Sequence, residues 1–163
     1  MQRTLVLFST LLLLVVLTLT VSAYDKCVAV NALSLTYGSI GATYETRHND
    51  TFSLVLGARV SSYGLSRASF TGLAGVRYYK DSTNMDGIYL EGKGFAGITV
   101  YGVGSSATFM IGPGVSGGYK YVFDKGYTID AGLGLGIPFY INTTSGFWVG
   151  VDFEPRIALG YSW

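Results

Sequence analysis

The sequence predicts an all-β fold, namely a closed antiparallel up-and-down transmembrane β-barrel of about eight strands. Two observations predict it: large apolar and small polar residues alternate over long stretches, and glycine and aromatic residues are abundant. The chain of 163 residues contains 23 glycines, 13 tyrosines and 9 phenylalanines, with only 3 prolines. Such a chain is too apolar and aromatic to be disordered, and too rich in glycine to form long helices.

The clearest alternation runs from Tyr127 to Ile141. One set of alternate positions carries large apolar side chains, such as Leu133 and Leu135, and the other carries mainly glycine. A period of two indicates a β-strand, and this run reaches the roughly 9–11 residues that a tilted strand needs to cross a bilayer. The same pattern recurs in seven further stretches: Val28–Tyr37, Ser39–His48, Thr51–Ser61, Ala68–Tyr79, Gly87–Tyr101, Ala107–Phe123 and Arg156–Trp163.

The two faces of these strands indicate which side meets lipid. In a water-soluble barrel or sandwich, large apolar side chains fill the interior, because voids are costly. Here the face opposite the apolar set consists mostly of Gly, Ser, Thr and Ala. An apolar outer face against lipid and a small, polar inner face would suit a narrow closed barrel, which also pairs every backbone polar group.

The links between the strands predict the topology. With both chain ends on the periplasmic side, the tight periplasmic turns are His48–Asp50, Asp81–Asp86 and Asp124–Gly126. The outer links are Tyr37–Ser39, Ser62–Arg67, Gly102–Ser106 and Asn142–Glu154. Phe147 and Trp148 in the last of these are expected to extend their strands toward the outer interface; the alternative is contact with a partner.

The N-terminus has the pattern of a cleavable signal peptide. A short start with Arg3 precedes an apolar run from Leu5 to Val21, and small residues at Val21–Ser22–Ala23 suit a signal peptidase. We therefore expect residues 1–23 to be removed and residues 24–163 to form one barrel domain, exported to the bacterial outer membrane. The lone cysteine, Cys27, is expected to have no special role.

Charged residues on the small-residue face are expected to point into the barrel. A charge on the lipid face would cost roughly 2–4 kcal/mol at the bilayer midplane, and a charge in a narrow interior must be paired. We expect a structural network of ion pairs there, and the alternative is an ion path or ligand site. The predicted lumen charges are Glu45, Arg47, Arg59, Arg77, Glu91, Lys93, Lys120, Asp130 and Arg156.

Nothing in the sequence predicts an enzyme, a cofactor or a metal site. His48 is the only histidine, so neither a positioned catalytic base beside a serine nor a histidine-containing metal cluster is expected. Gly132, Gly134 and Gly136 alternate within one strand and lack the strand-turn-helix setting of a nucleotide-binding loop. The formal net charge of +1 gives no basic field for nucleic acid.

The C-terminal segment Pro155–Trp163 resembles the last strand of outer-membrane barrels. The resemblance implies that Ile157, Leu159, Tyr161 and Trp163 form the signal that the barrel-assembly machinery reads during insertion. The mature chain is also similar to small barrels grouped with the OmpA/OmpX-like eight-stranded domains. That likeness rests on short motifs in order: Asn31–Ala–Leu, Tyr44–Glu45, Gly75–Val–Arg–Tyr78, Gly118–Tyr–Lys–Tyr121 and Gly126–Gly136.

The resemblance implies a fold and a location but no reaction or ligand. From the sequence we expect a non-enzymatic structural or interaction component of the envelope, with outer-membrane lipid as its surroundings. The alternative is a narrow pore for ions or small solutes. The width of the lumen would separate the two, because the interiors of eight-stranded barrels are filled by side chains.

Overall fold

The computed structural model describes residues 24–62, 67–80, 85–102, 107–142, 144 and 146–163. The expected signal peptide, residues 1–23, lies outside the described residues. The described elements are β1 (Lys26–Asn31), α2 (Ala32–Leu35), β2 (Ser39–Arg47), β3 (Phe52–Ser62), β4 (Arg67–Tyr79), β5 (Gly87–Tyr101), β6 (Ala107–Val122), β7 (Tyr127–Gly136), β8 (Phe139–Asn142), β9 (Gly146–Val149) and β10 (Asp152–Ser162).

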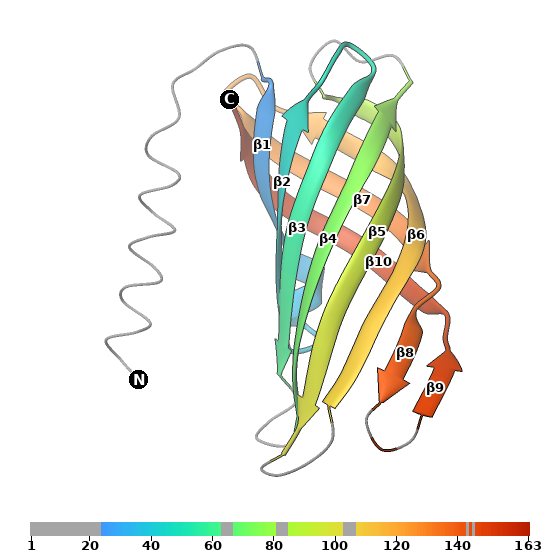
Figure 1. Ribbon diagram of the computed structural model, residues 1–163. Coiled ribbons are helices and arrows are strands. Elements are labelled where there is room, and N and C mark those ends of the chain that lie inside the picture. The colour runs from blue at the N-terminus through green and yellow to red at the C-terminus, as the bar shows by residue number, and fades with distance from the viewer. Residues whose placement is uncertain (1–23, 63–66, 81–84, 103–106, 143, 145) are drawn as a thin grey trace.

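The strands form a closed eight-stranded antiparallel barrel, which confirms the predicted fold class (Figure 1). From β1 to β7 each strand pairs with the next along the chain, β7 then pairs with β10, and β10 returns to β1. The two ends of the barrel domain lie together at one end of the barrel, where Lys26 and Trp163 exchange two backbone hydrogen bonds of 3.0 and 2.9 Å. We call this the terminal end, and the opposite end the open end.

The predicted long strand Tyr127–Ile141 is two strands in the structure, interrupted at Ile137 and Pro138. Pro138 has no N–H, so the strand pattern breaks there. The register nevertheless continues, because Ile137 N donates to Pro113 O at 2.9 Å and Gly150 N donates to Pro138 O at 2.9 Å. The expected outer loop Asn142–Glu154 is therefore shorter than predicted, because most of it forms strand β9 and the start of β10. The β8–β9 hairpin continues the sheet beside β6 at the open end of the barrel (Figure 1).

The first predicted strand is also shorter than expected. β1 ends at Asn31, and the single-turn helix α2 replaces the expected strand up to Tyr37. Ser34 Oγ contacts both Asn31 O, at 2.7 Å, and Ser39 O, at 3.1 Å, and so ties the turn together. Gly38 completes the turn with a φ of +68°, which side chains other than glycine rarely adopt.

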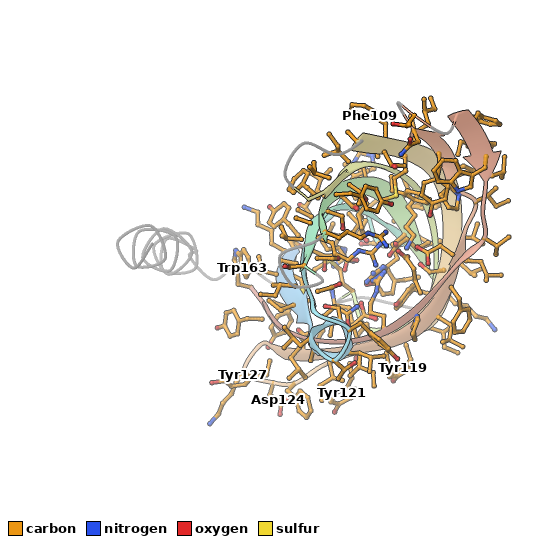
Figure 2. The ribbon with its side chains drawn as sticks, turned by 90° about the horizontal axis from the view of Figure 1, so that it is seen from below. Phe109, Tyr119, Tyr121, Asp124, Tyr127 and Trp163 are labelled. Atoms are coloured by element: carbon orange, nitrogen blue, oxygen red, sulfur yellow. The ribbon has the colours of Figure 1, made fainter. Side chains whose placement is uncertain are left out.

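The two alternating sets of residues separate as the periodicity predicts. On β3, Leu54 and Leu56 are exposed on the outside of the barrel, whereas Ser53 and Val55 are buried inside it. Viewed along the barrel, Tyr119, Tyr121 and Tyr127 project away from the wall and nitrogen-bearing side chains gather in the bore (Figure 2). The apolar side chains of this fold therefore face outward, around a polar interior.

Candidate functional site

Arg77 lies at the centre of a buried ion-pair cluster in the terminal half of the bore. Its side chain projects from β4 and donates to carboxylates on three other strands. Nη1 lies 2.9 Å from Glu45 Oε2 and 3.2 Å from Asp130 Oδ2, and Nη2 lies 2.7 Å from Glu91 Oε2. Strand alternation puts each of these residues on the inward face, so a single guanidinium joins β2, β4, β5 and β7.

Two further cations complete this cluster. Lys120 Nζ lies 2.8 Å from Glu45 Oε2, and Arg156 contacts both Glu91 and Asp130 at 3.3 Å. Glu45 Oε1 also accepts hydrogen bonds from Ser53 Oγ and Tyr79 Oη. We call the set Arg77, Lys120, Arg156, Glu45, Glu91 and Asp130 the inner cluster.

The inner cluster balances its formal charges, with each of the three cations bonded to at least one of the three carboxylates. Desolvating a charge is expensive unless a partner and hydrogen bonds compensate for it. Arg77, Glu91 and Lys120 are among the most deeply buried side chains of the described residues. The cluster therefore occupies the bore as a paired, water-poor layer.

Aromatic and apolar side chains close the bore on the terminal side of this layer. The Arg77 guanidinium lies 4.0 Å from the centroid of the Tyr89 ring, and Tyr89 Oη donates to Asp130 Oδ1 at 2.6 Å. Met85, from the β4–β5 turn, is buried in the same apolar group as Tyr79, Tyr89 and Cys27. Two layers, one ionic and one apolar, thus lie across the terminal half of the barrel.

Glycines make room for the Tyr89 ring. Gly118 and Gly132 face each other across β6 and β7, and Gly118 is also the β6 partner of Tyr89. A Cβ added at Gly118 would lie 2.6 Å from Tyr89 Oη, and one at Gly132 would lie 2.7 Å from the same atom. Both distances are shorter than real Cβ contacts, so these positions require glycine.

Toward the open end the bore holds a second ionic group. Glu154 on β10 accepts from Arg59 Nη2 at 3.1 Å and from Lys93 Nζ. Lys93 Nζ also lies 4.0 Å from Glu91 Oε1, which links this group to the inner cluster. Around them lies a cavity of about 510 Å³, lined by serine and threonine hydroxyls together with Arg59, Lys93, Glu154 and Arg156.

The predicted lumen charges come together inside the barrel with one exception. Glu45, Arg77, Glu91, Lys120, Asp130 and Arg156 form the inner cluster, and Arg59 and Lys93 form the second group. Arg47 lies apart from them at the terminal rim, 2.8 Å from Asp50 and 3.8 Å from Asp25.

Sequence reasoning missed three members of the network, namely Glu154, Tyr79 and Tyr89. Each lies two residues from a predicted lumen charge: Glu154 from Arg156, Tyr79 from Arg77, and Tyr89 from Glu91. The strand period would have placed them in the bore. Glu154 ends the expected outer link Asn142–Glu154, and no charge marks Tyr79 or Tyr89 as a lumen residue.

The C-terminal segment that resembles an insertion signal has four named residues, and three of them face outward. Ile157, Leu159 and Tyr161 are exposed on the outer face of β10, and the Tyr161 ring contacts the Tyr127 ring edge-on at 5.9 Å. Trp163 is only 5% exposed, whereas Tyr121, Tyr127 and Tyr161 near the same end are exposed. Recognition of this segment by the assembly machinery stays a prediction.

Metal-ligating side chains are not brought together in the described residues. Within them, no group of three or more His, Cys, Asp and Glu side chains could hold a metal ion. His48 lies in the β2–β3 turn, where its backbone N donates to Phe52 O at 2.9 Å. No helix in the described part of the chain is long and apolar enough to span a membrane.

Comparison of the chain with protein-family models, with curated proteins and with solved structures finds no match in any of the three. Three features of the barrel bear on its function: an outward apolar surface, a bore closed in its terminal half, and a polar cavity at the open end.

Proposed function

We propose that the protein is an outer-membrane barrel of the OmpA/OmpX-like kind, acting as a structural or interaction component of the bacterial envelope without catalysing a reaction. The observation that carries the proposal is the outward apolar surface. Exposed large apolar side chains occur on every barrel strand, for example Val30, Ile40, Leu54, Phe70, Leu90, Ile111, Leu133 and Leu159. Soluble monomers rarely expose contiguous apolar patches above a few hundred Å².

Strand length supports a membrane location. β5 has 15 residues, β6 has 16 and β7 has 10, whereas a tilted strand needs roughly 9–11 to cross the hydrocarbon. Exposed Tyr119, Tyr121, Phe123, Tyr127 and Tyr161 lie near the terminal end, at the end of β6, the start of β7 and the end of β10, where an aromatic belt would meet the headgroups. In this placement the terminal end faces the periplasm and the β8–β9 hairpin faces the outside.

The closed terminal half favours an anchor over a pore. A conducting path would have to pass the inner cluster and then Tyr79, Tyr89 and Met85, all of which are buried. Separating Arg77 from its carboxylates to open such a path would leave uncompensated buried charges. The cavity at the open end is the feature that favours a role in binding.

Membrane fractionation with gel electrophoresis of heated and unheated samples tests the location. We expect the chain in the outer-membrane fraction, with faster migration when unheated, because a folded barrel is compact. Orientation follows from surface labelling of Thr144→Cys and, as the matched control, Asp124→Cys, each combined with Cys27→Ser. Only the first should react in intact cells. A chain recovered in the soluble fraction would reject the proposal.

Planar bilayers test whether the barrel conducts. Purified protein should give no current steps above those of a protein-free control with the same detergent. Stable single-channel steps that depend on folded protein would reject the anchor role in favour of a narrow pore.

A further inference from the structure

The barrel wall is incomplete beside the polar cavity. β1 pairs with β10 only from Cys27↔Ser162 to Asn31↔Ala158, whereas β10 continues to Asp152. On the other side, β1 pairs with β2 only as far as Val30↔Ala42, whereas β2 begins at Ser39. Among the described strands, Asp152–Ile157 and Ser39–Gly41 thus have a partner on one side only. We call the region between them the side notch.

Local chemistry shows that this edge is left unpaired rather than closed by another strand. The backbone N of Ile157 donates to the side chain of Asn31, at 3.4 Å, in place of a strand partner. Pro155 lies two residues away, so its backbone faces the same edge, and it has no N–H to leave unsatisfied. The helix α2 follows Asn31 directly and contacts both β10 and β2, so it covers the part of the notch next to β1.

The cavity reaches the side notch. Its lining includes an unbroken stretch of β10 from Asp152 to Arg156, with Asn31, Ser34 and Gly41 on the opposite side. The stretch contains Phe153 and Pro155, which belong to the outward-facing set of β10. The cavity is therefore bounded along the notch by the edge of the strand as well as by its inner face.

Polarity changes sharply across the notch. Inside lie Arg59, Lys93, Asp152 and Glu154 with serine and threonine hydroxyl groups. Outside, the flanking side chains are apolar and exposed: Leu35 and Ile40 on one side, and Val151 and Phe153 on the other. A molecule that spans the notch would meet a polar surface at one end and an apolar surface at the other.

We propose that the cavity binds the phosphate-bearing headgroup of an amphiphile whose acyl chain leaves through the side notch into the surrounding lipid. Arg59 is the residue assigned to the phosphate. Within the described part of the chain, Nη2 is the only side-chain nitrogen of Arg59 that donates a hydrogen bond. Its remaining N–H groups suit the forked contact that guanidinium makes with phosphate oxygens. A cavity of about 510 Å³ is of ordinary size for a small ligand.

Calorimetry on the mature chain in a phosphate-free maltoside detergent tests this proposal. The probes are dioctanoyl phosphatidylglycerol, its phosphate-free counterpart dioctanoylglycerol, and free glycerol 3-phosphate. We expect saturable binding of one phosphatidylglycerol per barrel, with much weaker binding of the other two. Arg59→Gln should weaken binding about tenfold or more, since a hydrogen bond between charged groups is lost. Glu154 keeps Lys93 as a partner in that variant, so the barrel should still fold.

Arg47→Gln is the matched control, because Arg47 lies at the terminal rim away from the cavity. It should bind phosphatidylglycerol as the wild type does. Absence of saturable binding, or equal weakening by both substitutions, would overturn the proposal. Glycerol 3-phosphate binding as tightly as the lipid would overturn the side entry, because the acyl chain would then contribute nothing.

Photocrosslinking tests the route of the acyl chain. The crosslinker p-benzoylphenylalanine replaces Phe153 at the notch or, as control, Ile111 on β6; the two positions are equally exposed, at 60%. Crosslinks to lipid at position 153 should fall when unlabelled phosphatidylglycerol is added, and those at position 111 should not. Equal behaviour at the two positions would reject the notch. The assumption that the ligand comes from the surrounding membrane rests on the proposed membrane location, which fractionation tests independently of ligand binding.

Discussion

The central guanidinium carbon of Arg77 lies over the ring of Tyr89, 4.0 Å from the ring centroid. The same guanidinium donates to Glu45 and Glu91, and Tyr89 Oη donates to Asp130. This contact joins the ionic layer to the apolar layer beneath it. The interior of the barrel is thus one packed unit across its terminal half, and that unit should contribute strongly to stability.

Arg77→Met should destabilise the barrel by about 3–5 kcal/mol, because removing one partner leaves buried carboxylates uncompensated. The measurement is urea unfolding in detergent micelles, followed by the gel shift between folded and unfolded forms. Arg47→Met is the control. Because Arg47 pairs with an exposed aspartate at the rim, this variant should lose far less free energy of unfolding than Arg77→Met. A loss below about 1 kcal/mol for Arg77→Met would show that the cluster adds little to stability.

Gly118→Ala should destabilise the barrel by about 1–3 kcal/mol through overpacking. The new methyl group would lie 2.6 Å from Tyr89 Oη and closer still to the backbone oxygen of Ala131, which cannot move without shifting β7. Gly92→Ala on β5 is the matched control, because nothing lies within 4 Å of its added Cβ. The same unfolding experiment should separate the two variants; equal stability would contradict the tight packing at Gly118.

The period of two predicted most of this architecture. Residues such as Leu54, Leu133 and Leu159 face outward because alternation and inverted polarity together determine the face of each strand. Charges on the opposite face, such as Arg77 and Glu91, had to lie in the bore for the same reason. Their specific partners could not be read from the sequence, because pairing across the bore depends on barrel diameter and on side-chain reach.

The interruptions of the strands were harder to predict. Alternation runs on through Ile137–Pro138 and past Asn31, so periodicity alone gave longer strands than the structure has. Pro138 and Gly38 are the local signals of these two interruptions, and both mark a change in backbone geometry rather than in polarity. The side notch follows from the early end of β1, and hydrophobic patterning carries no information about where pairing between β1 and β10 stops.

Trp163→Phe should fold and insert as well as the wild type. Within the described part of the chain, the buried Nε1 of Trp163 has no hydrogen-bond partner, so removing it takes away an unsatisfied donor. Trp163→Ala should lower the amount of barrel recovered in the outer membrane, because the C-terminal strands that this segment resembles commonly end in an aromatic residue. The measurement is the heat-modifiable fraction per cell at equal synthesis. Equal recovery of both variants would argue against a role of Trp163 in insertion.

Leu133→Arg tests whether the outer surface lies in hydrocarbon. Leu133 is 58% exposed on the outer face of β7, six residues from Tyr127 in the expected aromatic belt, so it should lie near the bilayer midplane. In a bilayer, arginine there should cost about 2–4 kcal/mol. In water the same substitution on an exposed position should change stability little. Val151→Arg, toward the open end of the barrel, is the control and should cost at most about 1 kcal/mol. The unfolding free energies of the two variants are measured in phospholipid vesicles. If Leu133→Arg were as stable as Val151→Arg, lipid would not surround the middle of the barrel.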